Sequence, residues 1–231
     1  MRPLIGIDIG HYTAGPDAGT YKLSTAYVDA VERAGGAPLI LAPSPHTDIG
    51  ALLERVDGVL LTGGDDFCGE KPHPMSEPLT DRRLNFILPL CRALAENRMP
   101  FLAICLGCQA VNVALGGALY YDLPDELPES RVAHRPSLAG KAHRHEARAL
   151  PGTIFSSLWN ATTISINSTH HQALRELARG CRAGVIAPDG VIEGFELDDH
   201  PFGVAVQWHP ELMTDDPAQL TLFEKLIEAA Q

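Results

Sequence analysis

The stretch Pro100-Phe-Leu-Ala-Ile-Cys-Leu-Gly-Cys-Gln109 places a cysteine where an apolar run changes character. The residues before Cys105 read as a buried strand, and the residues after it continue with helical spacing. This pattern predicts a strand, a sharp turn and a helix, with the thiol at the turn. Such a turn projects the sulfur into the crevice at the carboxyl end of the strand, and the N-terminus of the helix favours the thiolate.

Three interpretations of Cys105 agree with this stretch alone. The cysteine can be a nucleophile, or it can be a small hydrophobe packed in the core. Because Cys108 completes a C-x-x-C pair, a thioredoxin-like redox role is the third interpretation. Only residues elsewhere in the chain can decide among them.

The order of the predicted elements indicates an α/β fold. Through the first two-thirds of the chain, short apolar runs alternate with amphipathic ones, which is typical of a mostly parallel central sheet flanked by helices on both faces in three layers. The predicted strands of this part are 4–8, 39–41, 58–62 and the run that ends at Cys105. The predicted helices are 24–34, 48–55, 81–97 and the helix that follows the turn at Cys105 and ends at Leu115.

The last third of the chain changes character. Its strands are expected at 162–166, 181–187, 191–197 and 202–207, with turns rather than long helices between them. Asp189-Gly190 is a strong hairpin signal, so antiparallel strands are expected at one side of the sheet. A closing helix is expected to begin near Asp216-Pro217. The segments 65–80 and 122–140 are expected to line the site.

Length, charge and cysteine content narrow the class of protein. The 231 residues contain no Ser/Gly-rich linker, so one domain over 1–231 is expected. A formal charge of −11 without a Lys/Arg cluster makes nucleic acid and anionic membranes poor partners. Five sparse cysteines indicate reduced thiols. With no apolar run near the roughly 18 residues that span a bilayer, and no export signal in the first residues, a cytoplasmic protein is expected.

A second motif supplies partners for the thiol. The stretch Phe202-Gly-Val-Ala-Val-Gln-Trp-His-Pro-Glu211 runs a predicted strand directly into a histidine and then a carboxylate. A cysteine nucleophile needs a base and a third group that orients the imidazole, and His209 and Glu211 are of the required types. Each residue alone is ordinary, because such a histidine is often a surface or capping residue and such a glutamate a helix-flanking charge. The combination favours the nucleophile.

At this point the chain resembles the class I glutamine amidotransferase-like family, and within it the peptidase C26-like branch of γ-glutamyl-γ-aminobutyrate hydrolases. The resembling segments are Leu60-Leu-Thr-Gly-Gly-Asp65, the Cys105 stretch with Asn112-Val-Ala-Leu-Gly-Gly117, Asn167-Ser-Thr-His-His-Gln172, Ala187-Pro-Asp-Gly190 with Glu193, and Val206-Gln-Trp-His-Pro-Glu211. They occur in the family's order over nearly the whole chain. The resemblance implies the flavodoxin-like fold of that family, in agreement with the predicted elements.

The resemblance also implies roles for individual residues. Cys105 matches the nucleophile, His209 its base and Glu211 the residue that orients the base. The backbone amides of Gly64 and Leu106 match the oxyanion hole. The residues that match substrate contacts are Gly63, Gln109, Ser168 and His170, with His171 nearly as good a match as His170. Tight turns after strands often use Gly-Gly, so Gly63-Gly64 also has a purely structural interpretation.

The implied reaction is cleavage of the γ-glutamyl amide bond of a small γ-glutamyl amine or amino acid through a γ-glutamyl thioester. It requires no metal and no organic cofactor. The alternatives are a glutaminase subunit that delivers ammonia to a separate synthetase, and a non-catalytic ligand-binding member of the fold. A small-molecule substrate is expected, a homodimer is compatible with the sequence, and the amine leaving group stays open.

The chain departs from the family pattern near the expected site. Ala103 stands where many members have glycine, and Leu106-Gly107-Cys108 stands where the hydrolase branch commonly has Arg-Gly-Met. The stretch Asp81-Arg-Arg-Leu84 lacks the acid often found at its end. These changes bear on the substrate more than on the triad. Cys108 is expected to be buried packing, since a disulfide with Cys105 would block catalysis.

Overall fold

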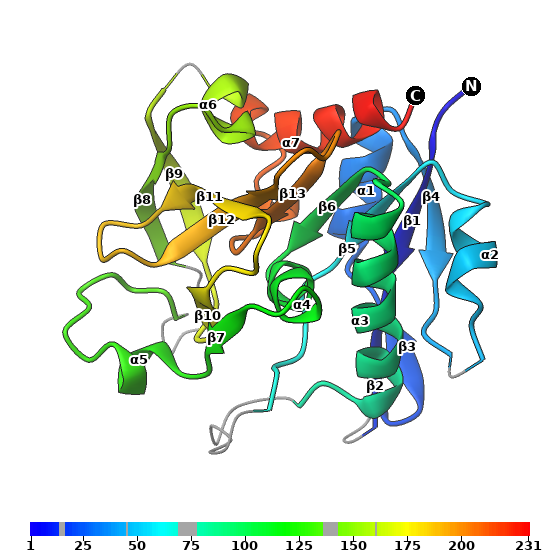
Figure 1. The fold of residues 1–231 in the computed structure, drawn as a ribbon, viewed down its shortest axis with the longest axis horizontal. Helices are drawn as coiled ribbons and strands as arrows, with labels where there is room; N and C mark the ends of the chain where they lie inside the picture. Colours follow the sequence, from blue (N-terminus) through cyan, green and yellow to red (C-terminus); the bar gives the residue numbers. More distant parts are fainter. Residues whose placement is uncertain (14–16, 45, 69–77, 136–142, 160) are drawn as a thin grey trace.

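The computed structural model describes residues 1–13, 17–44, 46–68, 78–135, 143–159 and 161–231. Within these ranges a mixed sheet crosses the molecule, with strand order β4-β1-β5-β6-β13-β12-β11-β8-β9 (Figure 1). Its parallel half comprises β4 (Ala37–Leu41), β1 (Leu4–Asp8), β5 (Gly58–Leu61), β6 (Phe101–Ile104) and β13 (Gly203–Val206). The predicted parallel core is therefore confirmed.

The antiparallel half begins where β12 pairs with β13. It comprises β12 (Ile192–Leu197), β11 (Cys181–Ile186), β8 (His143–Ala149) and β9 (Thr163–Ser168), and β10 (Ala173–Glu176) joins β12 to β7 (Ala118–Tyr120). The predicted Asp189-Gly190 turn connects β11 and β12, and Gly190 adopts a φ of 90° that favours glycine. The prediction of antiparallel strands at one side of the sheet is confirmed.

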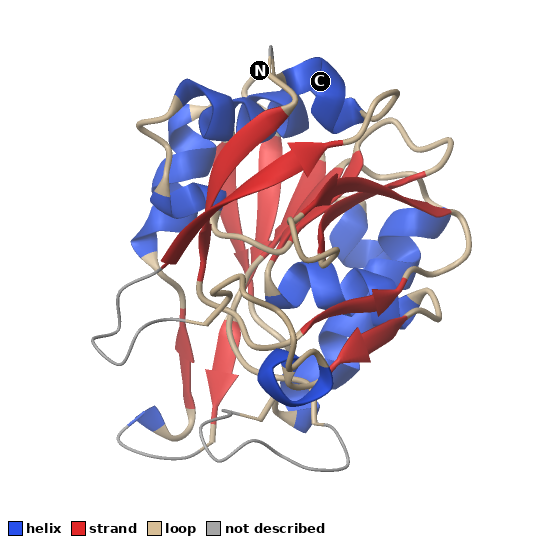
Figure 2. Ribbon diagram, turned by 90° about the vertical axis from the view of Figure 1, so that its left-hand side faces the viewer, coloured by secondary structure: helices blue, strands red, loops and turns tan. Residues whose placement is uncertain are grey.

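Helices cover both faces of the sheet, as the side view in Figure 2 shows. The longer helices are α1 (Thr25–Arg33), α3 (Asp81–Glu96), α4 (Leu106–Ala114) and α7 (Pro217–Ala229); the shorter ones are α2 (Ile49–Leu53), α5 (Leu123–Glu126), α6 (Ile154–Leu158) and the 3₁₀ turn η2 (Pro210–Leu212). Side-chain caps start several of them: Ser24, Asp48, Thr80 and Asp216 each accept a hydrogen bond from a first-turn amide. These caps explain why the sequence located the helix starts well.

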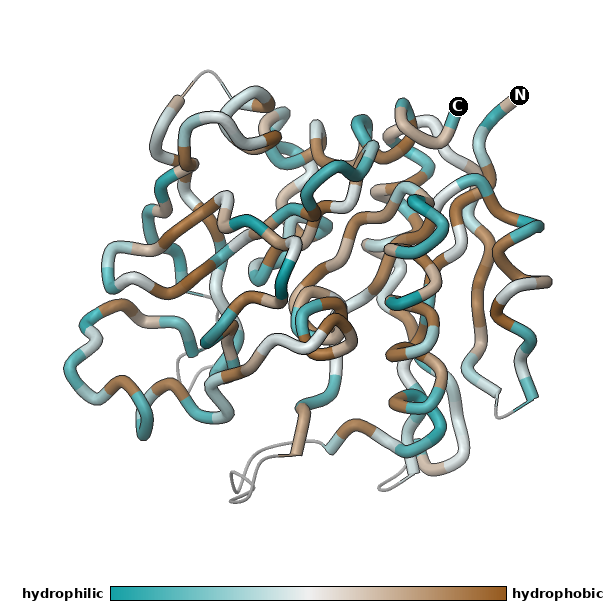
Figure 3. Tube along the Cα trace, viewed as in Figure 1, coloured by the Kyte–Doolittle hydropathy of each residue, from teal (hydrophilic) through white to brown (hydrophobic). Residues whose placement is uncertain are grey.

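Two hydrophobic cores lie on opposite faces of the sheet. Along β6, Leu102 and Ile104 pack on the side of α1 and α7, whereas Phe101 and Ala103 pack on the side of α3 and α4. This alternation is the period-two pattern of a strand buried on both faces, and the brown segments of Figure 3 follow the central strands accordingly. In the described part of the chain, no helix is long and apolar enough to cross a membrane.

Some elements were not predicted. The hairpin of β2 (Gly10–Tyr12) and β3 (Thr20–Lys22) is short and mostly exposed, and β7 and β10 are equally brief. Strand β8 carries many charged residues, which hid its alternating burial. The expected site-lining segments 65–80 and 122–140 lie partly outside the described residues, namely at 69–77 and 136–140. The described ends of the first meet in a bridge between Asp66 and Pro78.

Candidate active site

Cys105 occupies a strained turn between β6 and α4. Its φ of 52° and ψ of −106° lie in a region that non-glycine residues rarely adopt, and such strain is often stored at functional sites. The Cys105 amide donates to the Val206 carbonyl on β13 at 2.8 Å, which anchors the turn to the sheet. Gly107 permits the helix to approach closely, because a Cβ there would lie 2.7 Å from the Leu61 carbonyl oxygen. The predicted strand, turn and helix around Cys105 are therefore confirmed.

His209 follows β13 and is held from two directions. Its Nδ1 lies 2.6 Å from Glu211 Oε1, whose carboxylate is buried in η2. The side chain of Asn167 on β9 clamps the His209 backbone: Oδ1 accepts from the His209 amide and Nδ2 donates to its carbonyl, both at 2.8 Å. Because Nδ1 is engaged by Glu211, Nε2 is the nitrogen left for proton transfer.

Three side chains converge on Gly63. A Cβ at this position would lie 2.7 Å from His209 Cε1, 2.9 Å from the Tyr27 hydroxyl and 3.4 Å from Cys105 Cβ. The imidazole of His209 and the side chain of Cys105 therefore both lie beside Gly63. Burial by itself lowers the pKa of His209, but the charge of Glu211, and then Cys105, with which the ring hydrogen-bonds, raise that pKa well above 6.5. The imidazolium is the form that this environment favours.

The turn after β5 presents candidate oxyanion donors. The Gly63 amide is already engaged, since it donates to the Tyr27 hydroxyl at 2.9 Å. Gly64 has a φ of 144°, and a Cβ there would meet Arg83 Nη1 at 2.5 Å, so this position requires glycine. Leu106 is the first residue of α4, and its amide therefore has no acceptor within the helix. These positions agree with a hole built from the Gly64 and Leu106 amides.

A buried ion pair supports this turn, and sequence reasoning missed it. Arg83 reaches from α3 and is fully buried; its Nη2 lies 2.9 Å from Asp8 Oδ2 at the end of β1. The same Nη2 donates to Thr62 Oγ1 at 3.0 Å and to the Gly63 carbonyl at 3.2 Å. Asp8 in turn accepts from the Thr62 amide. The pair thus fixes both ends of the segment that carries Gly63.

The remaining predicted substrate contacts are buried and engaged with protein atoms. Gln109 donates through Nε2 to the Gln172 carbonyl and to Gln207 Oε1, both at 3.2 Å. Gln207 in turn donates to Cys105 Sγ at 3.6 Å, so Gln109 is connected to the nucleophile through one side chain. The Ser168 hydroxyl donates to the His134 carbonyl at 2.9 Å.

His170 and His171 are adjacent in sequence but have different surroundings. His170 is buried, and its Nδ1 lies 2.9 Å from the Gln172 carbonyl oxygen. His171 lies between two carboxylates, with Nε2 3.2 Å from Asp66 and Nδ1 3.7 Å from Asp122. A role in substrate binding remains a prediction for Gly63, Gln109, Ser168 and His170.

A cavity of about 200 Å³ opens beside the glycine turn. Its lining includes Tyr27, Gly63 and Gly64 together with residues of the β2–β3 hairpin. Lys22 contributes a positive charge to that lining and also pairs with Asp17. A small anionic group can therefore approach the turn from this side.

The C-x-x-C pair does not have the properties of a redox centre. All five cysteines, which lie in the described ranges, are free thiols. Cys108 is fully buried on α4, and burial, followed by the charges of Cys105 and Glu193, raises its pKa well above 9. A thiol that stays protonated and enclosed is a poor partner for thiol exchange. Cys108 is a core residue on the buried side of α4, as expected.

The fold and the site place the chain in a class of proteins. A mixed sheet with parallel central strands and a cysteine elbow is the architecture of class I glutamine amidotransferases. A solved structure from Thermoplasma acidophilum, a "putative gmp synthase subunit a protein", shares the fold with a TM-score of 0.68 over 100% of this chain and 94% of that chain at 14% identity. The family model Peptidase C26 matches residues 3–211. The chain belongs to the Peptidase C26 family.

Curated relatives agree with this assignment. Protein NtpR of Enterococcus hirae is 37% identical over 92% of both chains. The γ-glutamyl-γ-aminobutyrate hydrolase PuuD of Escherichia coli strain K12 is 31% identical over 92% of this chain and 87% of its own length. Together with the family match, these relatives support a hydrolase of the glutamine amidotransferase-like type, as the sequence motifs predicted.

Proposed function

We propose that the protein is a cysteine-dependent hydrolase that cleaves the γ-glutamyl amide bond of a small γ-glutamyl amine or amino acid. The observation that carries this proposal is that Cys105 and His209 both border Gly63 in the glycine turn after β5. A nucleophile, an oriented base and candidate oxyanion donors are the parts that acyl transfer requires. The name of the E. coli relative supports a γ-glutamyl substrate.

The first half of the reaction transfers the γ-glutamyl group to the enzyme. The Cys105 thiolate attacks the amide carbonyl, and a C–S bond forms while the carbonyl oxygen gains the negative charge. The Gly64 and Leu106 amides donate to that oxygen. The intermediate then collapses, the C–N bond breaks, and the leaving amine takes the proton from His209 Nε2. Glu211 stabilises the imidazolium until this transfer.

The second half hydrolyses the thioester. Neutral His209 accepts a proton from water, and the resulting hydroxide attacks the thioester carbonyl. The C–S bond breaks, glutamate leaves, and the thiolate–imidazolium pair is restored. Every proton transfer in this cycle runs through Nε2 of one histidine. Because one imidazole serves both steps, its position matters, and Glu211 holds the His209 ring while Asn167 holds the His209 backbone.

The cavity beside the turn bears on the substrate class. Its Lys22 ammonium favours a carboxylate, which every γ-glutamyl compound carries on its glutamate head and which an amino-acid leaving group carries as well. Gln109, Ser168 and His170 complete the proposed set of substrate contacts, together with Gly63. Gln109 acts closest to the thiol, through Gln207.

The test is glutamate release by the purified protein from a matched panel. The panel contains γ-glutamyl-γ-aminobutyrate, a γ-glutamyl diamine, a γ-glutamyl amino acid and glutamine. Release from a γ-glutamyl amine or amino acid, lost in Cys105→Ala and retained in Cys108→Ala, is the expected result. Release from glutamine alone would instead identify a glutaminase, and no release from any compound would contradict the proposal.

A further inference from the structure

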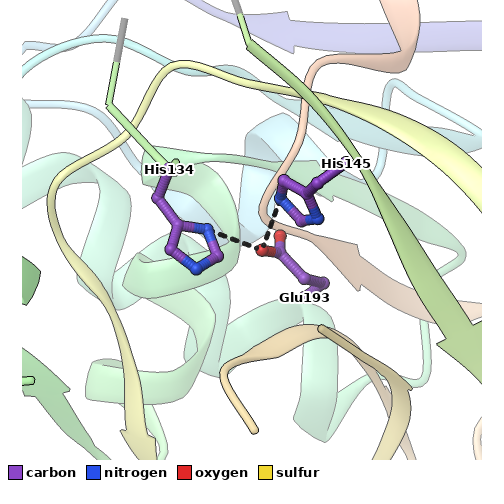
Figure 4. A group of neighbouring side chains, drawn as sticks. All are labelled: His134, His145 and Glu193. Carbon is purple, nitrogen blue, oxygen red and sulfur yellow. Dashed lines mark ion pairs between the residues drawn. The ribbon is translucent and has the colours of Figure 1, made fainter. Parts of the chain in front are cut away.

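A second buried polar cluster, His134, His145 and Glu193, contributes no residue to the triad or to the proposed substrate contacts. His134 follows α5, His145 lies on β8 and Glu193 lies on β12, and Figure 4 shows both rings pointing toward the carboxylate. His134 Nδ1 and His145 Nε2 lie 3.1 and 3.4 Å from Glu193 Oε1. His170 Nε2 approaches the same oxygen at 3.6 Å. Three imidazoles from three segments of the chain thus face one carboxylate.

In each of the three rings one nitrogen, the inner one, faces Glu193, and the other, the outer one, lies next to a hydrogen-bond acceptor. His145 Nδ1 lies 3.1 Å from the Glu146 carbonyl, and His170 Nδ1 lies 2.9 Å from the Gln172 carbonyl. His134 Nε2 lies 2.9 Å from Asp189 Oδ2. A carbonyl or carboxylate oxygen only accepts, so each outer nitrogen carries the hydrogen. In the neutral ring the inner nitrogen therefore presents its lone pair toward Glu193.

The inner atoms have no hydrogen-bond partner. Within the described ranges, His134 Nδ1, His145 Nε2, His170 Nε2 and both Glu193 carboxylate oxygens are buried and unsatisfied. Glu193 is fully buried. Lone pairs that converge on a buried carboxylate repel one another unless a cation lies between them. The arrangement therefore calls for positive charge at its centre.

We propose that His134, His145 and Glu193 bind one divalent transition-metal ion, with Zn²⁺ as the best match. Imidazole and carboxylate suit zinc, whereas Mg²⁺ and Ca²⁺ prefer oxygen ligands alone. Tetrahedral zinc with bonds of about 2.0–2.1 Å places its ligand atoms roughly 3.3–3.4 Å apart. The His134 and His145 nitrogens lie 3.1 and 3.4 Å from Glu193 Oε1, close to this spacing, and the three ligand atoms lie within 4.8 Å of one another. No metal was expected from the sequence.

The outer contacts have the form of a metal site's supporting shell. Metal-bound histidines usually donate their other N–H to a carboxylate or carbonyl, which sets the ring orientation and raises its basicity. Here Asp189 plays that part for His134 and is itself held by the Ser130 hydroxyl at 2.6 Å. The ligands come from elements far apart in sequence, so the ion would join β8 and β12 to the loop after α5.

The competing occupant is a proton. Burial opposes charge on His134, but the adjacent Asp189 and Glu193 carboxylates raise its pKa to about 9, so this ring carries positive charge when no metal is bound. Zinc must displace that proton, and its affinity therefore increases with pH. The two occupants differ in a directly measurable way, because only one of them appears in elemental analysis.

The experiment measures metal content and metal-dependent stability of the full chain. The protein is purified without a metal-affinity tag, stripped with a chelator and titrated with Zn²⁺, with Mg²⁺ as a comparison. One tightly bound zinc per chain and a higher melting temperature with Zn²⁺ than with Mg²⁺ are expected. Co²⁺ in place of Zn²⁺ should give the intense visible bands of a tetrahedral site.

Variants locate the ion. Glu193→Gln and His145→Ala should lose stoichiometric zinc, and Asp189→Asn should weaken it about 10–100-fold. His200→Ala is the matched control, because His200 is a half-buried histidine beyond the other end of β12 and should bind zinc as the parent does. Absence of zinc from the parent protein, or the same zinc affinity in Glu193→Gln, would overturn the proposal and leave the proton as occupant. Neither result depends on the proposed hydrolase activity.

Discussion

The candidate active site and the histidine cluster occupy different halves of the same sheet. Cys105 and His209 follow the parallel strands β6 and β13, so the carboxyl ends of neighbouring strands bring them together. The histidine cluster lies in the antiparallel half, where β8, β12 and two loops contribute one side chain each. Parallel strand ends thus gather reactive groups in a crevice, whereas in the antiparallel half side chains from separate elements surround a fully buried carboxylate.

Exposure separates the two clusters further. The His209 side chain keeps 15% of its surface exposed, whereas Glu193 keeps none. A reacting site must admit a substrate, whereas a structural metal site need not. If this division is correct, changes in one cluster leave the property measured at the other intact.

The largest expected effect is that of Cys105→Ala. Without the nucleophile, only binding and the oxyanion donors remain, so kcat/KM for the best panel substrate should fall about 10⁴-fold or more. Zinc content should stay at that of the parent protein. Steady-state glutamate release and elemental analysis on the same preparation check both statements. Loss of zinc in this variant would break the separation between the clusters.

Glu211→Gln should reduce kcat/KM by about 10³–10⁴-fold, somewhat less than removal of the nucleophile, because His209 loses the group that orients it and stabilises its charge. The lost carboxylate should also lower the His209 pKa, which Glu211 and then Cys105 raise against the effect of burial. The alkaline limb of the residual kcat/KM profile should therefore move to lower pH. A limb that stays in place would show that another group controls it.

The His209–Glu211 pair should also make the stability of the protein depend on pH. The folded pKa of His209 lies above its unfolded value of about 6.5, so its stabilising contribution is complete below that value and is lost as pH rises through the folded pKa. The parent protein should thus lose more unfolding free energy than Glu211→Gln between neutral and alkaline pH. Urea unfolding at several pH values measures this difference, and parallel pH dependences would contradict it.

Arg83→Met should destabilise the protein by about 3–5 kcal/mol, because it leaves two buried carboxylates, Asp8 and Asp65, without their cationic partner. The double variant Asp8→Asn with Arg83→Met also removes the nearer carboxylate and should recover part of that loss. Arg82→Met is the matched control, since Arg82 is the exposed neighbour on α3. Urea midpoints compare the three, and equal losses in Arg82→Met and Arg83→Met would refute the role of the buried pair.

These residues also show how far sequence reasoning reaches. The parallel strands and capped helices were predicted because apolar periodicity and caps are local signals, and the motifs brought Cys105, His209 and Glu211 to notice. Nothing in the sequence indicated that Arg83 is buried, since arginines are rarely buried and its partner Asp8 lies far away in sequence, at the end of β1. His134 and His145 carried no signal of their own. Their meeting depends on the pairing of β8 and β12 with β11, which the charged sequence of β8 concealed.

The smallest expected effect belongs to Tyr27→Phe, which tests the support of the glycine turn. The Tyr27 hydroxyl accepts the Gly63 amide hydrogen at 2.9 Å and lies beside His209 and Cys105. Its loss leaves that amide without its acceptor, at a cost of about 1–1.5 kcal/mol, and loosens the peptide that precedes the Gly64 donor. If the turn serves the oxyanion, this energy is lost in the transition state, so kcat should fall about tenfold while KM changes little. Tyr21→Phe is the control, because Tyr21 lies on the exposed β2–β3 hairpin and its hydroxyl donates to the Pro43 carbonyl. A Tyr27→Phe variant that changes KM instead would place Tyr27 in ground-state substrate binding, and the turn would then belong to recognition rather than to catalysis.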